Sequence, residues 1–220
     1  MVWRNLKLFL LNSRVVEPDV VMNRLDEFRF NGVEGITGFE TWEEFNEIRF
    51  NYLFSVPRYV RVARFEGNRI EEEKVKLDTV ANVEFHIRSS GIIESYGSPV
   101  LAERALEAVS TLGDIDPVVF VQRDFERIMR MASDIRKVRI YGTEDEHVVE
   151  VVLVGGGLSA SRELKRFSRS GKIREVSGKI ELPNGIYSFA MSENQLRVFV
   201  KDVKESQKDV EFLIDSLISP

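Results

Sequence analysis

The hydrophobic residues follow two periods, an alternation typical of half-buried strands and a recurrence every three to four residues typical of helices. In the first half they predict a strand over residues 6–11, a helix with Val21, Met22, Leu25 and Phe28 on one face, and strands over residues 59–65, 83–87 and 92–96. Glycines predict a loop over residues 31–38, and the polar residues 70–76 predict a break between strands. The first half therefore predicts an α+β unit that begins with a strand.

The helix that follows Ser98 is the best-specified element. Ser98 is a typical N-cap residue, Pro99 suits the first helical position, and Gly113 ends the segment. The apolar face of this helix consists of Ala102, Ala105, Leu106, Val109 and Leu112. A strand, a tight turn at residues 89–91, a second strand and this helix complete the first half.

The second half shows the same order. Its predicted elements are a strand over residues 118–121, a helix over 124–132, strands over 138–141 and 148–154, a glycine-rich loop, strands over 186–191 and 196–200, and a last helix with Val210, Leu213, Ile214 and Leu217. The hairpins lie 104 residues apart (Ile92 to Leu196), and the helices match at a spacing of 108 (Ala102 to Val210). We therefore expect two related α+β halves, residues 1–113 and 114–220, each an antiparallel sheet backed by its C-terminal helix.

Two stretches carry this repeat, VEFHIRSSGIIESYGSPVLAERALEAVSTL and YSFAMSENQLRVFVKDVKESQKDVEFLIDSL. Their pattern resembles the last strands and the long helix of each repeat in the TATA-binding protein, and the resemblance covers about the last third of each half. It implies a curved sheet whose concave face lies on the minor groove, with pairs of phenylalanines wedged into base steps. No phenylalanine of this chain matches such a position by motif. The same fold also serves protein contacts and regulation.

Composition restricts the function classes. The chain has 220 residues, a net charge of −5, no cysteine and two histidines, which excludes a disulfide framework, a thiolate zinc site and a cysteine nucleophile. We expect no cofactor and no enzymatic activity. The apolar run over residues 8–11 is too short for a signal-peptide core or a membrane span, which predicts a cytoplasmic protein without membrane contact. High charge and few glutamines are typical of heat-adapted proteins.

A basic segment, residues 162–179, is the main candidate binding site. Its cations are Arg162, Lys165, Arg166, Arg169, Lys172, Arg174 and Lys179, against only Glu163 and Glu175. Lys and Arg supply phosphate contacts, so the first six predict a nucleic-acid-binding surface. Further cations that extend it are Arg123, Arg127, Arg130, Arg136, Lys137 and Arg139. The alternative is a solvated helix face stabilised by ion pairs four residues apart.

The glycine-rich loop from Gly155 to Ala160 follows an apolar run and has the pattern G-x-G-x-x-A. In dinucleotide-binding proteins such glycines let a pyrophosphate approach a helix N-terminus, and Glu175 lies where an acidic residue would bind the ribose. Only about a fifth of the chain follows Glu175, which is too little for the parallel βαβ units of that fold. A structural loop is the alternative.

Other candidate residues favour structural roles. The carboxylates at residues 71–73 are interpreted as a solvated charge run, His86 as a surface or pairing residue on a strand, and His147 as a turn residue. The aromatic residues Phe45, Phe50, Tyr52 and Phe54 are interpreted as core positions, with base stacking as the alternative. Trp42, in an acidic loop, is a candidate partner contact.

The leading hypothesis is a non-enzymatic nucleic-acid-binding module that uses the basic segment for phosphate contacts. The second is a protein-interaction or assembly subunit, as a homodimer or with another partner. The third is a nucleotide-binding protein that uses the loop from Gly155 to Ala160.

Overall fold

The computed structural model describes residues 2–11, 18–42, 47–66, 69–142, 148–202 and 205–218. The chain is α+β, with antiparallel pairing between its long strands and five α-helices within the described residues. It divides into two compact units, one formed by Leu10–Asp116 and the other by Met1–Phe9 with Pro117–Pro220. β6 (Ile115–Pro117) lies where the chain passes between them. None of the described helices has the length and apolar character needed to cross a membrane.

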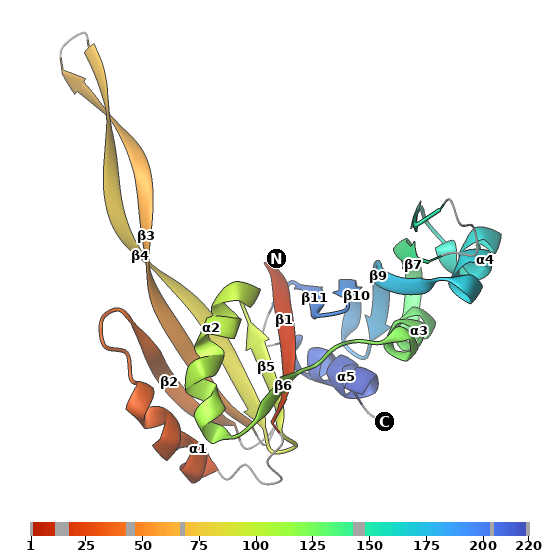
Figure 1. Cartoon of the computed structure of the whole chain (residues 1–220), viewed down its shortest axis with the longest axis horizontal. Coiled ribbons are helices and arrows are strands. Elements are labelled where there is room, and N and C mark those ends of the chain that lie inside the picture. Colours follow the sequence, from red (N-terminus) through yellow and green to blue (C-terminus); the bar gives the residue numbers. More distant parts are fainter. Residues whose placement is uncertain are drawn as a thin grey trace. The chain divides into compact units, whose positions relative to one another are not determined.

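The unit formed by Leu10–Asp116 has the strand order β2-β3-β4-β5. Its elements are α1 (Pro18–Leu25), η1 (Asp26–Phe28), β2 (Glu34–Trp42), β3 (Glu47–Glu66), β4 (Arg69–Arg88), β5 (Ile92–Tyr96), α2 (Pro99–Val109) and η3 (Ser110–Leu112) (Figure 1). Phe50 and Phe85 are paired across β3 and β4 with their rings stacked at 5.2 Å, and both are buried. The same face of the sheet contributes Ile48, Phe54, Val83 and Ile87 to the core. Phe50, Tyr52 and Phe54 are therefore core residues, as predicted, and Phe45 lies outside the described residues.

The helix predicted after Ser98 is confirmed. Ser98 has the extended backbone of an N-cap residue, and Ala102, Ala105 and Ala108 are buried. Gly113 has a φ of 152°, a conformation that favours glycine and ends the helical segment.

The loop predicted over residues 31–38 is wrong over residues 34–38, because Glu34 to Trp42 form β2. Gly35 has a φ of 141°, and a Cβ atom built there would lie 2.6 Å from the Cα of Phe30. The register with β3 shifts between Thr37 and Glu40. Gly35 allows the close approach to Phe30, and Gly38 lies at the register shift. Glycine within a strand often marks such a bulge or a close backbone approach.

The break predicted over residues 70–76 is also wrong, because β3 and β4 pair without interruption from Glu47 opposite Arg88 to Glu66 opposite Arg69. β2 pairs with β3 only as far as Phe54, and β5 pairs with β4 only from Glu84 to Ile87. The remainder is a two-stranded ribbon that extends beyond the other strands of its unit (Figure 1). Most of the described side chains of this ribbon are exposed or half-buried, so its strands do not show the alternation of apolar and polar residues that predicts a half-buried strand.

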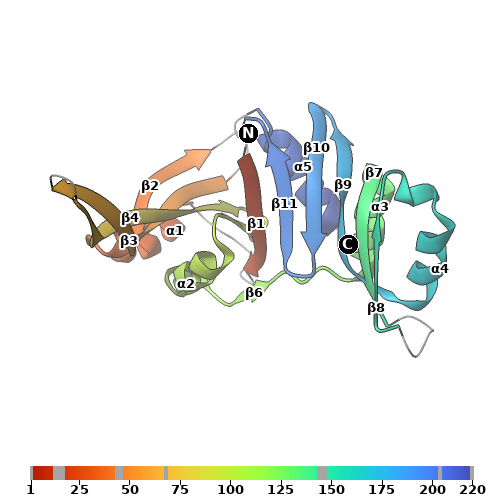
Figure 2. The ribbon, with the colours of Figure 1, turned by 90° about the horizontal axis from the view of Figure 1, so that it is seen from above.

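The unit formed by Met1–Phe9 and Pro117–Pro220 has the strand order β1-β11-β10-β9-β7-β8 (Figure 2). Its elements are β1 (Val2–Leu11), α3 (Gln122–Met131), β7 (Ala132–Tyr141), β8 (Glu150–Val154), η4 (Leu158–Ala160), α4 (Arg162–Ser170), β9 (Lys172–Leu182), β10 (Gly185–Ser192), β11 (Gln195–Val200) and α5 (Gln207–Ile218). Alternate strand residues are buried together with α3 and α5 residues; they include Val176, Ile180, Phe189, Met191, Leu196 and Val198, with Phe125, Ile128, Leu213 and Ile214. The intervening residues, among them Ser177, Lys179, Ser188, Ala190 and Arg197, are half-buried or exposed and form the open face of this sheet.

Residues 118–121 do not form the predicted strand. The Val118 N–H donates to the Leu8 carbonyl (2.9 Å), and the Phe120 N–H donates to the Glu193 carbonyl (2.8 Å). These are two isolated hydrogen bonds and do not form a strand ladder. The Val121 N–H donates to the Asp124 carboxylate (2.8 Å), so this segment leads directly into α3.

The order of elements in the first half recurs in the second. The first half runs β1, α1, β2, β3, β4, β5, α2, and the second runs β6, α3, β7, β9, β10, β11, α5 once β8, η4 and α4 are set aside. The strand order β2-β3-β4-β5 likewise corresponds to β7-β9-β10-β11, with β8 added beside β7. The two orders differ by β8, the glycine-rich loop, η4 and α4, which lie between β7 and β9.

Candidate nucleic-acid interface

Helix α4 presents the first four predicted cations on its exposed surface. The Ser161 hydroxyl accepts a hydrogen bond from the Leu164 N–H (3.2 Å) and caps the helix, while Leu164 is buried. The exposed cations are Arg162, Lys165, Arg166 and Arg169. Burial of one apolar side chain thus fixes which side of α4 faces solvent.

The cations of α4 are not stabilised by the expected ion pairs. Among the residues that the structure describes, none of the four cations, nor Lys172 after the helix, lies in an ion pair with a carboxylate. The one acidic residue of α4, Glu163, accepts a hydrogen bond from the Ser161 hydroxyl (2.8 Å). Hydrogen bonds from its own backbone N–H and from Ser161 lower the pKa of Glu163. The positive charge of α4 therefore faces solvent without a described ion pair, and only Arg162 has a Coulombic interaction with Glu163.

Five of the six cations proposed to extend the patch, all except Arg130, have structural partners instead. Their ion pairs are Arg123 with Asp124 (3.6 Å), Arg136 with Asp134 (2.9 Å), Lys137 with Glu175 (2.8 Å), and Arg139 with Glu150 (3.1 Å) and Glu175 (3.3 Å). Arg127 donates to the carbonyls of Ser216 (3.0 Å) and Leu217 (3.1 Å) at the end of α5. These cations are paired within their own unit, so most of the predicted cations without a described ion pair lie on α4 or directly after it.

A groove of about 610 Å³, called here the basic groove, separates the start of α3 from the junction of α4 and β9. Three predicted cations line it, Arg169, Lys172 and Arg174. Its other lining residues include Gln122, Ser168, Val119, Phe120, Val121 and Glu193. The side chain of Gln122 accepts a hydrogen bond from the Ile173 N–H (3.0 Å), which fixes the two walls of the groove to each other.

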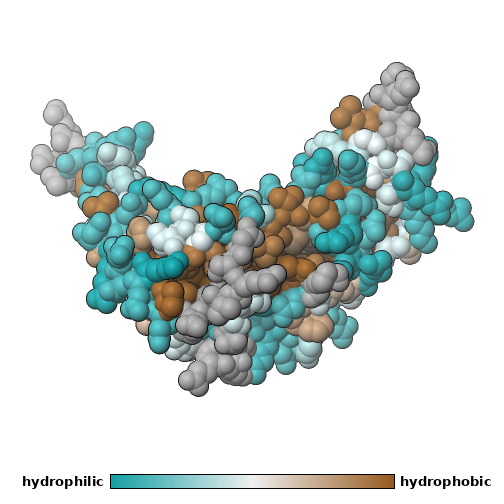
Figure 3. Space-filling model, turned by 60° about the horizontal axis from the view of Figure 1, so that its bottom comes forward, coloured by the Kyte–Doolittle hydropathy of each residue, from teal (hydrophilic) through white to brown (hydrophobic). Residues whose placement is uncertain are grey.

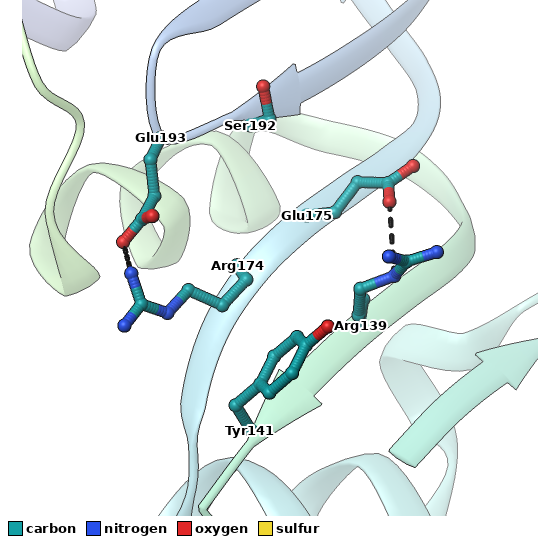
Figure 4. A pocket seen from close by; sticks show the side chains of 6 residues that line it. All are labelled: Arg139, Tyr141, Arg174, Glu175, Ser192 and Glu193. Carbon is teal, nitrogen blue, oxygen red and sulfur yellow. Dashed lines mark ion pairs between the residues drawn. The ribbon is translucent and has the colours of Figure 1, made fainter. Parts of the chain in front are cut away.

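A second hollow of about 420 Å³, called here the sheet pocket, lies next to the basic groove and shares Arg174 and Glu193 with it (Figure 4). Arg174 and Glu193 form an ion pair at this shared wall. The sheet pocket is completed by Arg139, Tyr141, Glu175 and Ser192. Arg139 and Ser192 are both paired with Glu175 across β7, β9 and β10, so three neighbouring strands position the pocket.

The structure brings together only part of the predicted set. Arg169, Lys172 and Arg174 meet at the basic groove, whereas Lys165 lines a separate hollow of about 290 Å³ with Arg130 and Leu164. Arg166 lies over the Phe167 ring, with its guanidinium carbon 5.4 Å from the centroid. The sequence did not indicate Tyr141, Ser192 or Glu193, because they come from separate strands and a turn.

The glycine-rich loop has its own backbone partners. The Gly157 N–H donates to the Asp134 carboxylate (3.0 Å), and the Gly155 N–H donates to the Arg136 carbonyl (2.9 Å). Hydrogen bonds from Arg136 and from Gly157 hold the pKa of Asp134 below its usual range. β8, which precedes the loop, pairs antiparallel with β7, whereas dinucleotide sites of this pattern follow a parallel strand.

His86 is fully buried, so its interpretation as a surface residue is wrong, while its pairing is confirmed. Its Nε2 lies 2.7 Å from the Glu84 carboxylate, and its Nδ1 lies 3.7 Å from Glu47 and 3.9 Å from Glu94. Arg49 pairs with Glu47 and Arg88 pairs with Glu94 in the same cluster. Cross-strand register places Arg49 and Glu94 on either side of His86, which explains a cluster that alternation along one strand does not predict.

The remaining candidates carry no site. His147 lies outside the described residues, and the described carboxylates Glu72 and Glu73 are exposed. Trp42 ends β2 and is not in the predicted loop; its side chain lies outside the described part. In the described ranges no group of three or more His, Asp or Glu side chains is placed so that it could hold a metal ion. In comparisons with known proteins, no family model matches the chain and no curated protein is similar to it.

Proposed function

We propose that the chain is a non-enzymatic nucleic-acid-binding module in which α4 and the basic groove contact phosphates. The observation that carries this proposal is the set of exposed cations, Arg162, Lys165, Arg166, Arg169 and Lys172, that form no ion pair with a carboxylate among the described residues. A cation without a partner binds a phosphate without first losing an ion pair, and it releases counterions when it does so. Solvated helix faces usually carry both signs of charge, and α4 carries one glutamate.

The tandem arrangement of two halves resembling the TATA-binding protein belongs to the same proposal. It is supported by the recurring element order and by the matching strand orders β2-β3-β4-β5 and β7-β9-β10-β11. In that family the sheet face contacts nucleic acid. The open face described above, with the small residues Ser177, Ser188 and Ala190 beside Lys179 and Arg197, is compatible with such a contact.

The experiment is a salt series of binding to fluorescent single- and double-stranded DNA and RNA. The Arg166→Glu, Arg169→Glu double variant is compared with wild type and with a control, Lys74→Glu, Lys76→Glu, which makes the same change in net charge on the exposed ribbon. We expect the slope of log K against log salt to fall by about 1.4–1.8 in the first variant, from about 0.7–0.9 per phosphate contact. Binding that is absent at low salt, or that both variants reduce equally, would overturn the proposal.

The protein-interaction hypothesis stays open as an alternative proposal. Apolar areas lie among hydrophilic residues on the surface (Figure 3), and the exposed apolar side chains include Val119, Val121 and Phe212. Such residues favour protein contacts when they form a continuous patch. A stable homodimer or a co-purifying partner would support this alternative.

The nucleotide-binding hypothesis at the loop from Gly155 to Ala160 has less support. Two of its backbone donors, the N–H groups of Gly155 and Gly157, are already bonded within the chain. A flat thermal-shift panel of nucleotides would remove it. The cytoplasmic location and the heat-adapted source stay predictions from composition.

A further inference from the structure

The sheet pocket differs in chemistry from the basic groove that it adjoins. Its wall contains two carboxylates, Glu175 and Glu193, in addition to the guanidinium groups of Arg139 and Arg174. A phosphate is repelled by such carboxylates, whereas N–H groups on the edge of a base donate to them. The pocket therefore suits a neutral ligand with polar edges better than it suits a phosphate.

Tyr141 supplies a flat surface in this pocket. Its ring lies beside Arg139 and Arg174 among the lining residues (Figure 4). Tyr141 is half-buried at the end of β7, where it pairs with Lys172 of β9 and Glu150 of β8. An aromatic ring held on a strand and flanked by cations is a stacking surface for bases. The volume of about 420 Å³ lies within the roughly 300–1,000 Å³ range of small-ligand sites.

We propose that the sheet pocket holds one unpaired nucleobase, with its ring on Tyr141 and its N–H donors on Glu175 or Glu193, while the adjoining phosphate lies in the basic groove. This inference rests on the proposed function and names single-stranded nucleic acid as its ligand. Arg174 lines both hollows, so one guanidinium lies between the base site and the phosphate site. Phosphate binding at Arg174 competes with Glu193 and leaves that carboxylate available to the base.

The geometry makes a prediction about strandedness. In a duplex the base edges are paired and the faces are stacked, so a base enters the pocket only after it has left the helix, at a cost of a few kcal/mol. We therefore expect tighter binding of single strands than of duplexes. Guanine has two adjacent N–H donors on its pairing edge, so it complements a carboxylate better than the other bases do.

The test measures fluorescence anisotropy with 16-nucleotide uridine tracts that carry one central guanine, adenine or cytosine, and with matched duplexes. Tyr141→Ala is expected to weaken single-strand binding about 5- to 150-fold, from about 1–3 kcal/mol per stacked base, and to leave duplex binding unchanged. Tyr141→Phe keeps the ring and should bind like wild type. Circular dichroism melting shows whether each variant is folded. If Tyr141→Ala is not folded, the comparison of single strands with duplexes on the wild-type protein decides, because equal affinity would overturn the base pocket.

The outcomes separate the two proposals. Salt-dependent binding that is equal for single strands and duplexes, with no effect of Tyr141→Ala, would overturn the base pocket and leave the basic groove intact. Equal affinity for all central bases would overturn the role of the carboxylates. No binding of any nucleic acid at low salt would overturn the proposed function itself.

Discussion

Asp209 is a buried carboxylate in the first turn of α5, and its loss should destabilise the unit that contains it. Only 1% of this residue is exposed. It accepts hydrogen bonds from the Asn184 backbone N–H (3.1 and 3.2 Å), from the Asn184 side-chain amide (3.0 Å) and from the Tyr187 hydroxyl (2.6 Å). In the described residues it forms no ion pair, so these donors and the helix N-terminus compensate its burial.

The magnitude follows from the exposure of each donor. A hydrogen bond to a charged group contributes about 1.5–3 kcal/mol, and the half-buried Tyr187 hydroxyl loses most of this when its acceptor is removed. Asn184 is exposed, so its donors regain water and account for about 0.5–1 kcal/mol. We expect Asp209→Ala to lower the free energy of unfolding by about 2–4 kcal/mol, and Tyr187→Phe by about 1–2 kcal/mol.

Urea unfolding followed by circular dichroism measures both changes. Asp215→Ala, an exposed position on the same helix, is the control and should change the free energy of unfolding by about 0.5 kcal/mol or less. The double variant Asp209→Ala, Tyr187→Phe should be less destabilised than the sum of the single variants by about 1–2 kcal/mol, because both remove the same bond. Additive effects, or an Asp209→Ala variant as stable as the control, would refute this account of the buried carboxylate.

Three further predictions concern pH, packing and the ribbon. Burial, followed by the hydrogen bond to Asp209, raises the pKa of Tyr187. The contribution of the neutral hydroxyl to the free energy of unfolding should therefore be fully present below pH 10 and be lost as pH rises above it. Tyr187→Phe should reduce this loss in urea titrations at pH 8–11, and an unchanged pH dependence would contradict the prediction. Gly178→Ala places a Cβ atom 2.1 Å from the Asp134 carbonyl oxygen and should lower the melting temperature, whereas Gly156→Ala meets nothing within 4 Å and should not. Replacing residues 60–75 by Asn-Gly should shorten the ribbon and leave the circular dichroism of a folded protein, and an unfolded product would show that the ribbon is needed for folding.

The sequence predicts the elements that bury one apolar face. The hairpin of β4 and β5, the helix after Ser98, and the matching β10, β11 and α5 follow directly from local periodicity and capping residues. The strand predicted over residues 59–65 is confirmed as the outer part of β3, whereas β2 and the outer part of β4 were missed for different reasons. The glycines of β2 serve a bulge, and the ribbon has neither a buried face nor a turn inside residues 70–76.

The candidate site was predicted only as far as it is continuous in sequence. Arg162, Lys165, Arg166 and Arg169 lie on one exposed helix surface because Leu164 fixes the opposite side. The partners of the other cations depend on cross-strand register, as in the ion pair of Lys137 with Glu175, and a single sequence does not determine register. For the same reason the sheet pocket, which draws on three strands and the turn at Glu193, could not be predicted.

Residues 1–113 and residues 114–220 differ most in the middle of their element order. β3 and β4 of the first half have 20 residues each, whereas in the second half β8, η4 and α4 lie between β7 and β9. The exposed cations of the basic segment that form no described ion pair lie on α4 or directly after it, at Lys172. If the halves arose from one ancestral unit, the proposed phosphate contacts come from the segment that the halves do not share. Loss of binding in the Arg166→Glu, Arg169→Glu variant with an unchanged fold would then assign the activity to this segment and the stability to the repeated elements.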